Sequence, residues 1–235
     1  MHEERNTKFA HSGEDGALRS LKPNDDFLQA TYVRTSCTQV CGHERFRCKS
    51  CVKTVLVNIH PERNPERNLK AYALIDDQSN RSLARSEFFD YFGENTQEIE
   101  YMLSSCPGHI STIGRQTSWY VIESLDGGTS LPLHTLIECN QIPNMREEIP
   151  TPEVARYHEL FKDIADEIPP YDPDAPILLL ISRDMIAAHH VLDQRIGRSN
   201  TPYAQKLRLG LVVIGETCLG AAHELEMITT NKVYV

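Results

Sequence analysis

Two adjacent carboxylates follow a short apolar run in the segment Ala73-Leu-Ile-Asp-Asp-Gln-Ser-Asn80. The run predicts a buried strand that delivers Asp76 and Asp77 into a polar turn. Aspartic peptidases need an Asp at the end of such a strand, where two facing carboxylates share one proton. One of them accepts a proton from water while the other polarises the scissile carbonyl. The same residues are typical of a plain turn closed by Asp hydrogen bonds, so both interpretations are open on this segment alone.

A second apolar run, Ile177–Ile181, ends in Ser182-Arg183-Asp184. It predicts a buried strand that finishes in a charged, solvated turn. Between the two runs, Gly108 and Gly114 flank a short polar and apolar stretch. These glycines could hinge a substrate-covering hairpin or could serve an ordinary hairpin.

Cysteines crowd into one short segment near the N-terminal end. The chain has seven cysteines, an odd number, which favours reduced thiols over a secreted disulfide framework. Zinc takes four Cys or His ligands at short spacings, so the segment predicts either a zinc site or unliganded thiols in a flexible lead-in. The candidate ligands are Cys37, Cys41, Cys48 and Cys51, with His43 as a fifth. The adjacent His189 and His190 would point to different faces of a short helix, so we expect surface or half-buried histidines there.

The elements that must position these residues are mostly strands. We expect a helix over 82–92 that stops at Gly93, and a longer helix over 151–168 with Thr151 as its cap and Pro152 in its first turn. Asp126-Gly127-Gly128 predicts a tight hairpin turn. The predicted strands are 54–59, 69–75, 119–124, 129–133, 177–181 and 209–214, with further strands within 99–140. The fold class is therefore mainly β.

The net charge and the hydrophobic content limit the kinds of partner that we expect for this chain. The formal net charge is −9 and 40% of the 235 residues are hydrophobic, which is typical of a globular chain without a basic nucleic-acid face. The longest apolar runs are too short to span a bilayer, and the first residues lack the apolar core of a signal peptide. We expect a soluble, intracellular, cytoplasmic protein without membrane or direct nucleic-acid contacts.

Most of the chain, from about Cys48 to Gly220, resembles one family in collinear order. The stretches that carry the resemblance are AYALIDDQSNRSLARSEFF, SLPLHTLIECNQIPNMREEIPTPE, ILLLISRDM and PYAQKLRLGLVVIGETCLG. They are similar to the aspartic peptidase region of BEL/Pao-type retrotransposon polyproteins. The resemblance implies a retropepsin-like acid-protease β-barrel with one or two peripheral helices, and self-processing of a polyprotein.

The resemblance also assigns roles. Asp76 matches the catalytic Asp, and Ser79 matches a small hydroxyl residue that often follows. Asp77 stands where Ser or Thr is common, and Gln78 stands where Gly is common. The second apolar run matches a strand that packs beneath the catalytic loop and ends in Gly-Arg-Asp/Asn. The matching residues here are Ser182, Arg183 and Asp184, with Ser182 in place of the Gly.

The polar and Cys/His-rich composition of the first residues, together with the resemblance, predicts four segments along the chain. They are a flexible linker or polyprotein junction (1–35), a Cys/His-rich segment (36–53), the retropepsin-like peptidase domain (54–220) and a C-terminal tail (221–235).

The expected function is that of an aspartic endopeptidase acting on its own polyprotein without a cofactor. One Asp motif per chain predicts a homodimer, because the mechanism needs two carboxylates. The rival prediction is a catalytically silent binding or assembly module, which the residues at Gln78 and Ser182 favour. A zinc-dependent RNA-binding segment at 37–51 is a third, weaker interpretation, because the chain is acidic.

Overall fold

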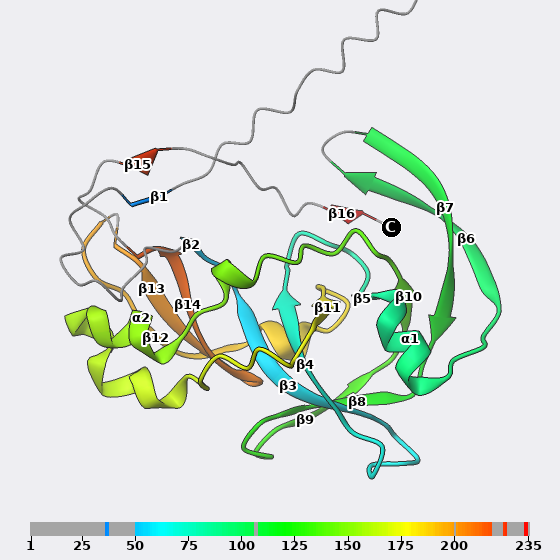
Figure 1. The fold of residues 1–235 in the computed structure, drawn as a ribbon, viewed down its shortest axis with the longest axis horizontal. Coiled ribbons are helices and arrows are strands. Elements are labelled where there is room, and N and C mark those ends of the chain that lie inside the picture. Colours follow the sequence, from blue (N-terminus) through cyan, green and yellow to red (C-terminus); the bar gives the residue numbers. More distant parts are fainter. Residues whose placement is uncertain are drawn as a thin grey trace, which may run out of the picture. The chain divides into compact units, whose positions relative to one another are not determined.

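The computed structural model describes residues 36–37, 50–105, 108–199, 201–217, 223–224 and 233–234, all within a compact unit of residues 32–235. This unit is mainly β, as the sequence predicts (Figure 1). Its strands are β1 (Ser36–Cys37), β2 (Ser50–Cys51), β3 (Thr54–Pro61), β4 (Leu69–Ile75), β5 (Leu83–Ala84), β6 (Glu98–Ser105), β7 (Gly108–Thr117), β8 (Tyr120–Ser124), β9 (Ser130–Leu133), β10 (Leu136–Glu138), β11 (Ile177–Ile181), β12 (Val191–Arg195), β13 (Tyr203–Leu207), β14 (Gly210–Glu216), β15 (His223–Glu224) and β16 (Val233–Tyr234). The helices are α1 (Ser86–Phe92) and α2 (Pro152–Tyr157), with 3-10 turns η1 (Arg146–Glu148), η2 (Glu159–Glu167) and η3 (Ile186–His189).

Among the described residues, ten strands form one sheet in the order β16-β6-β7-β10-β5-β11-β4-β3-β8-β9. The sheet curls, and its strand order runs open from one end to the other (Figure 1). At its centre, β11 lies between β4, to which it is parallel, and β5, to which it is antiparallel. The chain from β4 to β5 therefore loops over the end of β11, and this loop carries Asp76.

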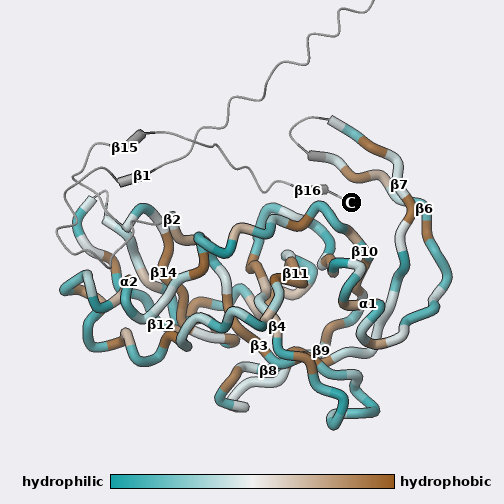
Figure 2. Tube along the Cα trace, in the orientation of Figure 1, coloured by the Kyte–Doolittle hydropathy of each residue, from teal (hydrophilic) through white to brown (hydrophobic). Residues whose placement is uncertain are grey.

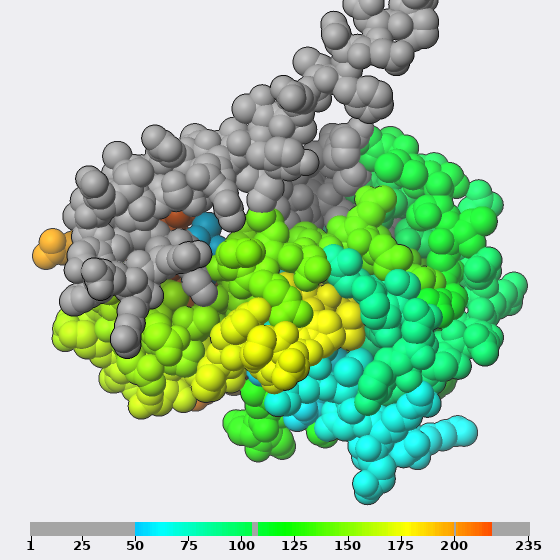
Figure 3. All heavy atoms as spheres, viewed as in Figure 1, coloured from blue at the N-terminus to red at the C-terminus, as the bar shows by residue number. Residues whose placement is uncertain are grey.

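The central strands are buried because their sequences are apolar without alternation. Every residue of β11 is buried, as expected for a strand covered on both faces. The main core cluster joins β3, β4, β8 and β11 to the three phenylalanines of α1. Apolar segments gather along these central strands in Figure 2. In the space-filling view the yellow surface of the segment that contains β11 borders the blue-green surface of the segment that contains α1 (Figure 3).

A second described sheet has the order β12-β13-β14-β2. The β13–β14 hairpin supports α2 and η2 through a separate apolar cluster that includes Phe161, Leu211 and Val213. Short segments outside the predicted 54–220 domain also pair in sheets. β2 pairs with β14, β15 with β1, and β16 with β6. Residues 54 and 220 therefore do not mark the limits of the strand pairing.

Two helix predictions need correction. The predicted 82–92 helix begins only at Ser86, because Leu83 and Ala84 form β5 and are fully buried between β10 and β11. Gly93 ends α1 in the left-handed conformation, as predicted.

The predicted 151–168 helix breaks at His158, whose backbone is extended, and continues as the 3-10 segment η2. Pro152 does occupy the first turn, but the Thr151 side chain makes no capping hydrogen bond. Within the described parts of the chain, no helix is long and apolar enough to cross a membrane.

Candidate functional site

The chain leaves the central sheet at Asp76, directly after β4 ends at Ile75. The Asp76 backbone N–H donates to the Ile181 carbonyl, with an N···O distance of 2.9 Å. The parallel strands β4 and β11 thus end side by side, with the half-buried Asp76 at their common end. The predicted placement of Asp76 in a loop after a buried strand and next to 177–181 is confirmed.

The Asp76 carboxylate is fixed by its own loop. The Gln78 backbone N–H donates to Oδ1 at 2.9 Å, and the Ser79 hydroxyl donates to Oδ2 at 2.6 Å. Ser79 is buried, whereas the side chains of Asp77 and Gln78 are exposed. Both carboxylate oxygens are therefore oriented by donors of the loop, one of them the Ser79 hydroxyl.

Gln78, which stands where the sequence resemblance implies Gly, has no visible backbone strain. Among the described residues, Trp119 is the single non-glycine residue with a positive φ. Gln78 therefore turns the chain with an ordinary φ, a conformation in which a Cβ atom costs little. Its contribution to the loop is the backbone N–H, which any residue except proline supplies.

A second polar cluster lies where the chain leaves β11. The buried Ser182 donates its backbone N–H to Ser82 Oγ at 3.1 Å and its hydroxyl to Asp184 Oδ1 at 2.8 Å. Ser82 donates its backbone N–H to Asp184 Oδ2 at 2.9 Å and its hydroxyl to Oδ1 at 2.6 Å. Asp184 thus accepts three side-chain and backbone bonds from two buried serines. Ser182, which stands where the sequence resemblance implies Gly, supplies one of them.

Two further contacts link the residues that follow β11 to the Asp76 loop and to η3. The Arg183 N–H lies 3.5 Å from the Ser79 carbonyl, and the Arg183 side chain is exposed. His189 Nε2 lies 2.8 Å from the Ser182 carbonyl, so this nitrogen carries the proton that the bond needs. His189, the last residue of η3, is half-buried and His190 after it is exposed, in agreement with the expected surface or half-buried histidines.

Gly108 and Gly114 both lie in the long β6–β7 hairpin, which is paired from Glu98↔Arg115 to Ser105↔Gly108. Gly108 begins β7 with a φ of +133°, a conformation that favours glycine. Gly114 lies inside β7, where an added Cβ would come within 2.7 Å of the Glu138 carbonyl oxygen. The hairpin therefore approaches β10 so closely at Gly114 that a side chain would not fit there. A hinge at these glycines stays a prediction.

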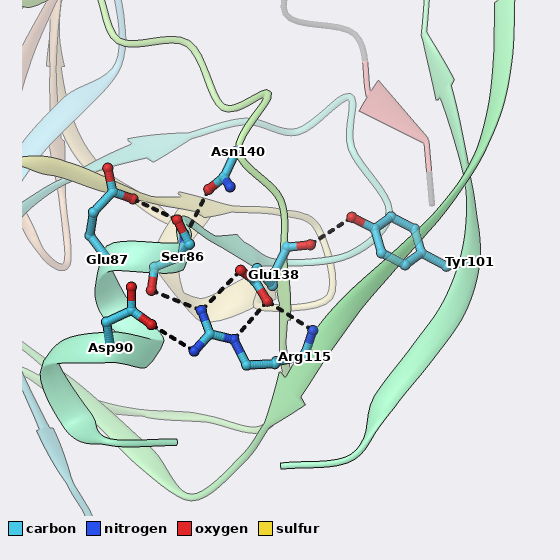
Figure 4. Close-up of polar contacts among 7 residues, drawn as sticks. All are labelled: Ser86, Glu87, Asp90, Tyr101, Arg115, Glu138 and Asn140. Atoms are coloured by element: carbon cyan, nitrogen blue, oxygen red, sulfur yellow. Dashed lines mark hydrogen bonds and ion pairs between the residues drawn. The ribbon is translucent and has the colours of Figure 1, made fainter. Parts of the chain in front are cut away.

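Arg115 fastens the base of this hairpin to two neighbouring elements. Its Nε and Nη2 donate to the two carboxylate oxygens of Glu138 on β10, at 2.8 and 3.0 Å. Its Nη1 donates to Asp90 at 2.7 Å and its Nη2 to the Ser86 carbonyl at 3.2 Å, both on α1. Figure 4 shows the guanidinium between α1 and Glu138, with Tyr101 of β6 donating to the Glu138 carbonyl.

Opposite charges strengthen the contact of Arg115 with Glu138. The bonds from Arg115 lower the pKa of Glu138, and Glu138 in turn raises the pKa of Arg115. The guanidinium also lies 5.0 Å from the centre of the Phe89 ring. Burial raises the pKa of Tyr101, which keeps its hydroxyl protonated as a donor. The base of the hairpin is therefore held by charge-assisted bonds, while its outer part carries the exposed side chains of Met102, Ile110 and Ile113.

The predicted zinc site is mostly outside the described side chains, which do not include Cys37, Cys41, His43 or Cys48. Cys51 is described and lies in the apolar cluster around α2 and η2. Within the described residues, no group of three or more His, Cys, Asp or Glu side chains could hold a metal ion. The zinc site stays a prediction.

The sequence did not indicate three contacts: that of Ser82 with Asp184, that of Arg115 with Glu138, and that of His189 with the Ser182 carbonyl. The first two pairs are separated by 102 and 23 positions and depend on the order of strands in the sheet, which no local spacing signals. His189 and Ser182 are only 7 positions apart, but their contact depends on how η3 folds back on the end of β11.

Comparisons of the chain with models of protein families, with curated proteins and with solved structures give no match.

Proposed function

We propose that this chain is an aspartic endopeptidase of the retropepsin type, with Asp76 as its catalytic carboxylate and a polypeptide, its own polyprotein, as substrate. One observation carries the proposal. Asp76 lies at the end of a buried strand, and both its carboxylate oxygens are oriented by donors of its own loop, Gln78 N–H and Ser79 Oγ. A carboxylate fixed in this way loses little freedom when it positions a water molecule.

The chemistry requires a second carboxylate. One ionised carboxylate accepts a proton from the attacking water, while a protonated partner donates a hydrogen bond to the scissile carbonyl. Each chain supplies one such loop, so a symmetric homodimer would place two copies of Asp76 together. No metal or organic cofactor is needed for these steps.

The surroundings of the loop support the proposal. The polar cluster of Ser82, Ser182 and Asp184 fixes the far end of the Asp76 loop where it meets β11. The β6–β7 hairpin, anchored by Arg115, extends from the same curled sheet (Figure 1). Such a hairpin is suited to covering an extended peptide and excluding water.

Cleavage by purified protein tests the proposal, with a library of peptides as substrate and Asp76→Asn compared with Asp77→Asn. We expect Asp76→Asn to abolish cleavage and leave the fold intact, because Asn is nearly isosteric and the Ser79 hydroxyl can accept as well as donate. Asp77→Asn should retain most of the activity, since Asp77 is exposed. Undiminished cleavage by the folded Asp76→Asn protein would exclude the mechanism.

The alternative function is a catalytically silent binding or assembly module of a retroelement-derived protein. The observation that favours it is that both Asp76 oxygens already accept hydrogen bonds within the loop, as in a turn closed by an Asp side chain. A silent module predicts no cleavage by folded wild-type dimer, together with a clear loss of stability in Asp76→Ala. Cleavage that depends on Asp76 would exclude it.

A further inference from the structure

The contacts of the β6–β7 hairpin with the rest of the chain weaken from its base to its outer part. Arg115 fastens the base through charge-assisted bonds to Glu138 and to α1. Further out, Leu103 is buried in an apolar cluster with Ile137 of β10. The exposed side chains of the outer part are those of Met102, Ile110 and Ile113, which are 58%, 47% and 63% exposed. The outer part therefore depends on fewer contacts than the base.

β16 adds a strand to the outer edge of β6, at the end of the hairpin that lies farthest from the base (Figure 1). The two strands are antiparallel, with Val233 opposite Ser105 and Tyr234 opposite Ser104. The same two serines pair on their other side with the first residues of β7. A segment from the far end of the sequence thus binds the outermost described rungs of the hairpin.

The edge of β6 is longer than the strand that occupies it. β6 has eight residues and β16 has two. In the part of the chain that the structure describes, the stretch 98–103 of this edge faces no strand. Such an edge presents backbone N–H and C=O groups that bind an extended segment. Each cross-strand pair contributes only about 0.2–1 kcal/mol, so a contact of two residues can form and break.

We propose that the outer edge of β6 is a docking site for an extended strand of this same chain, and that β16 binds there as a reversible strap on the β6–β7 hairpin. Bound β16 turns a two-stranded ribbon, which is marginally stable alone, into three strands. Its release leaves the hairpin held at the base by Arg115 and at Leu103, and frees the outer part. The consequence for substrate entry rests on the proposed function, because there the hairpin covers the peptide.

The position of β16 favours a strap over a simple cap of the sheet edge. Caps keep open edges from pairing with other chains. A cap would cover the longest open stretch, which is 98–103, yet β16 binds at Ser104 and Ser105. A contact at this end has the greatest leverage on the hairpin, because the bonds of Arg115 fix the opposite end.

Amide hydrogen exchange of the full chain tests the docking. Along β6 the N–H groups point alternately to β7 and to the outer edge, so one of the Ser104 and Ser105 N–H groups faces β16. Val233→Pro combined with Tyr234→Pro disfavours the pairing, since proline removes the N–H groups of β16. This outward N–H should then exchange about threefold faster or more, as expected for one lost backbone hydrogen bond. The bonds between β6 and β7 should loosen around Leu103.

Asn231→Pro is the matched control, because it lies outside the two paired positions, and its exchange should equal that of wild type. Unchanged exchange at Ser104 and Ser105 in the double variant would overturn the docking. Faster exchange there without loosening around Leu103 would overturn the restraint and leave β16 as a cap.

Peptide cleavage by the same variants is a separate measurement. Release of the strap should raise the rate about threefold or more, because the hairpin must lift for a peptide to enter. An unchanged rate with a loosened hairpin would overturn the role of the strap in substrate entry. Absence of cleavage in wild type and variants alike counts against the proposed function, whereas the exchange result decides whether the strap exists.

Discussion

Asp184 shows how one exposed carboxylate can fix two buried serines. It accepts bonds from the Ser82 backbone N–H and from the hydroxyls of Ser82 and Ser182. Asp184→Asn would turn an amide donor toward one of these donors. We expect the free energy of unfolding to fall by about 1–3 kcal/mol, the cost of an unsatisfied buried donor. Urea denaturation measures this change.

Asp166→Asn is the matched control, because the ion pair of Asp166 with Arg156 is exposed. Its stability should stay within about 0.5 kcal/mol of wild type. Equal destabilisation by the two substitutions would show that the polar cluster at the end of β11 contributes nothing specific.

Gln78 illustrates a case where the structure alters the expectation from sequence. The sequence resemblance implies Gly at this position, so Gln78→Gly is the substitution that would restore the pattern. Gln78 has no positive φ, and it binds Asp76 through its backbone N–H. We expect Gln78→Gly to lower stability by about 0.5–1 kcal/mol through the added freedom of the unfolded chain. Cleavage should not increase, and a large rise in cleavage would show that the Gln78 side chain obstructs the site.

At the scale of elements, continuous apolar runs made β4 and β11 predictable, because strands buried on both faces carry no polar alternation. The short strands β5 and β12 have no comparable signal. Their strand character depends on the neighbours they pair with, which sequence periodicity does not show. The break at His158 is also absent from the pattern, since the apolar spacing fits an α-helix throughout 151–168.

Gly114 sets the distance between the β6–β7 hairpin and β10. A Cβ at this position would lie 2.7 Å from the Glu138 carbonyl oxygen and 3.2 Å from the Tyr101 ring. Gly114→Ala should therefore shift the hairpin and lower stability by about 1–3 kcal/mol. Thermal or urea unfolding measures the loss. Ser111→Ala, on the same strand and exposed, should be nearly neutral, and equal effects would contradict the close packing.

The contact of Arg115 with Glu138 predicts a pH-dependent stability. The pKa of Glu138 is lowered from its ordinary value of 4.5 mainly by bonds from Arg115. Above pH 4.5 the carboxylate is ionised in both folded and unfolded chains, so its stabilisation is fully present there. As the pH falls through the lowered pKa of the folded state, the carboxylate is protonated and the stabilisation is lost.

Glu138→Gln tests this contribution. At pH 7 we expect a loss of about 1–2 kcal/mol, because one charge-assisted bond is weakened and another is removed. The difference from wild type should shrink below pH 4.5, when wild type loses the same charge. Glu66→Gln, at an exposed loop position, serves as the control. A difference that stays constant from pH 7 to pH 3 would contradict the role of the ionised carboxylate.

At the scale of the whole molecule, the sequence predicts the mainly β class and the meeting of Asp76 with β11. It does not predict the open strand order or the second sheet, because both depend on pairings between segments far apart in the chain. The position of Asp76 at the end of two buried strands remains the strongest support for the proposed chemistry.

The central claim is that two chains each contribute Asp76 to one active site. The most direct measurement mixes wild type with Asp76→Asn at constant total concentration, and follows peptide cleavage after subunit exchange. If the dyad is shared, mixed dimers are inactive, so an equal mixture should retain about a quarter of the wild-type rate. A rate of about half, linear in the wild-type fraction, would mean that each chain acts alone and would contradict the account.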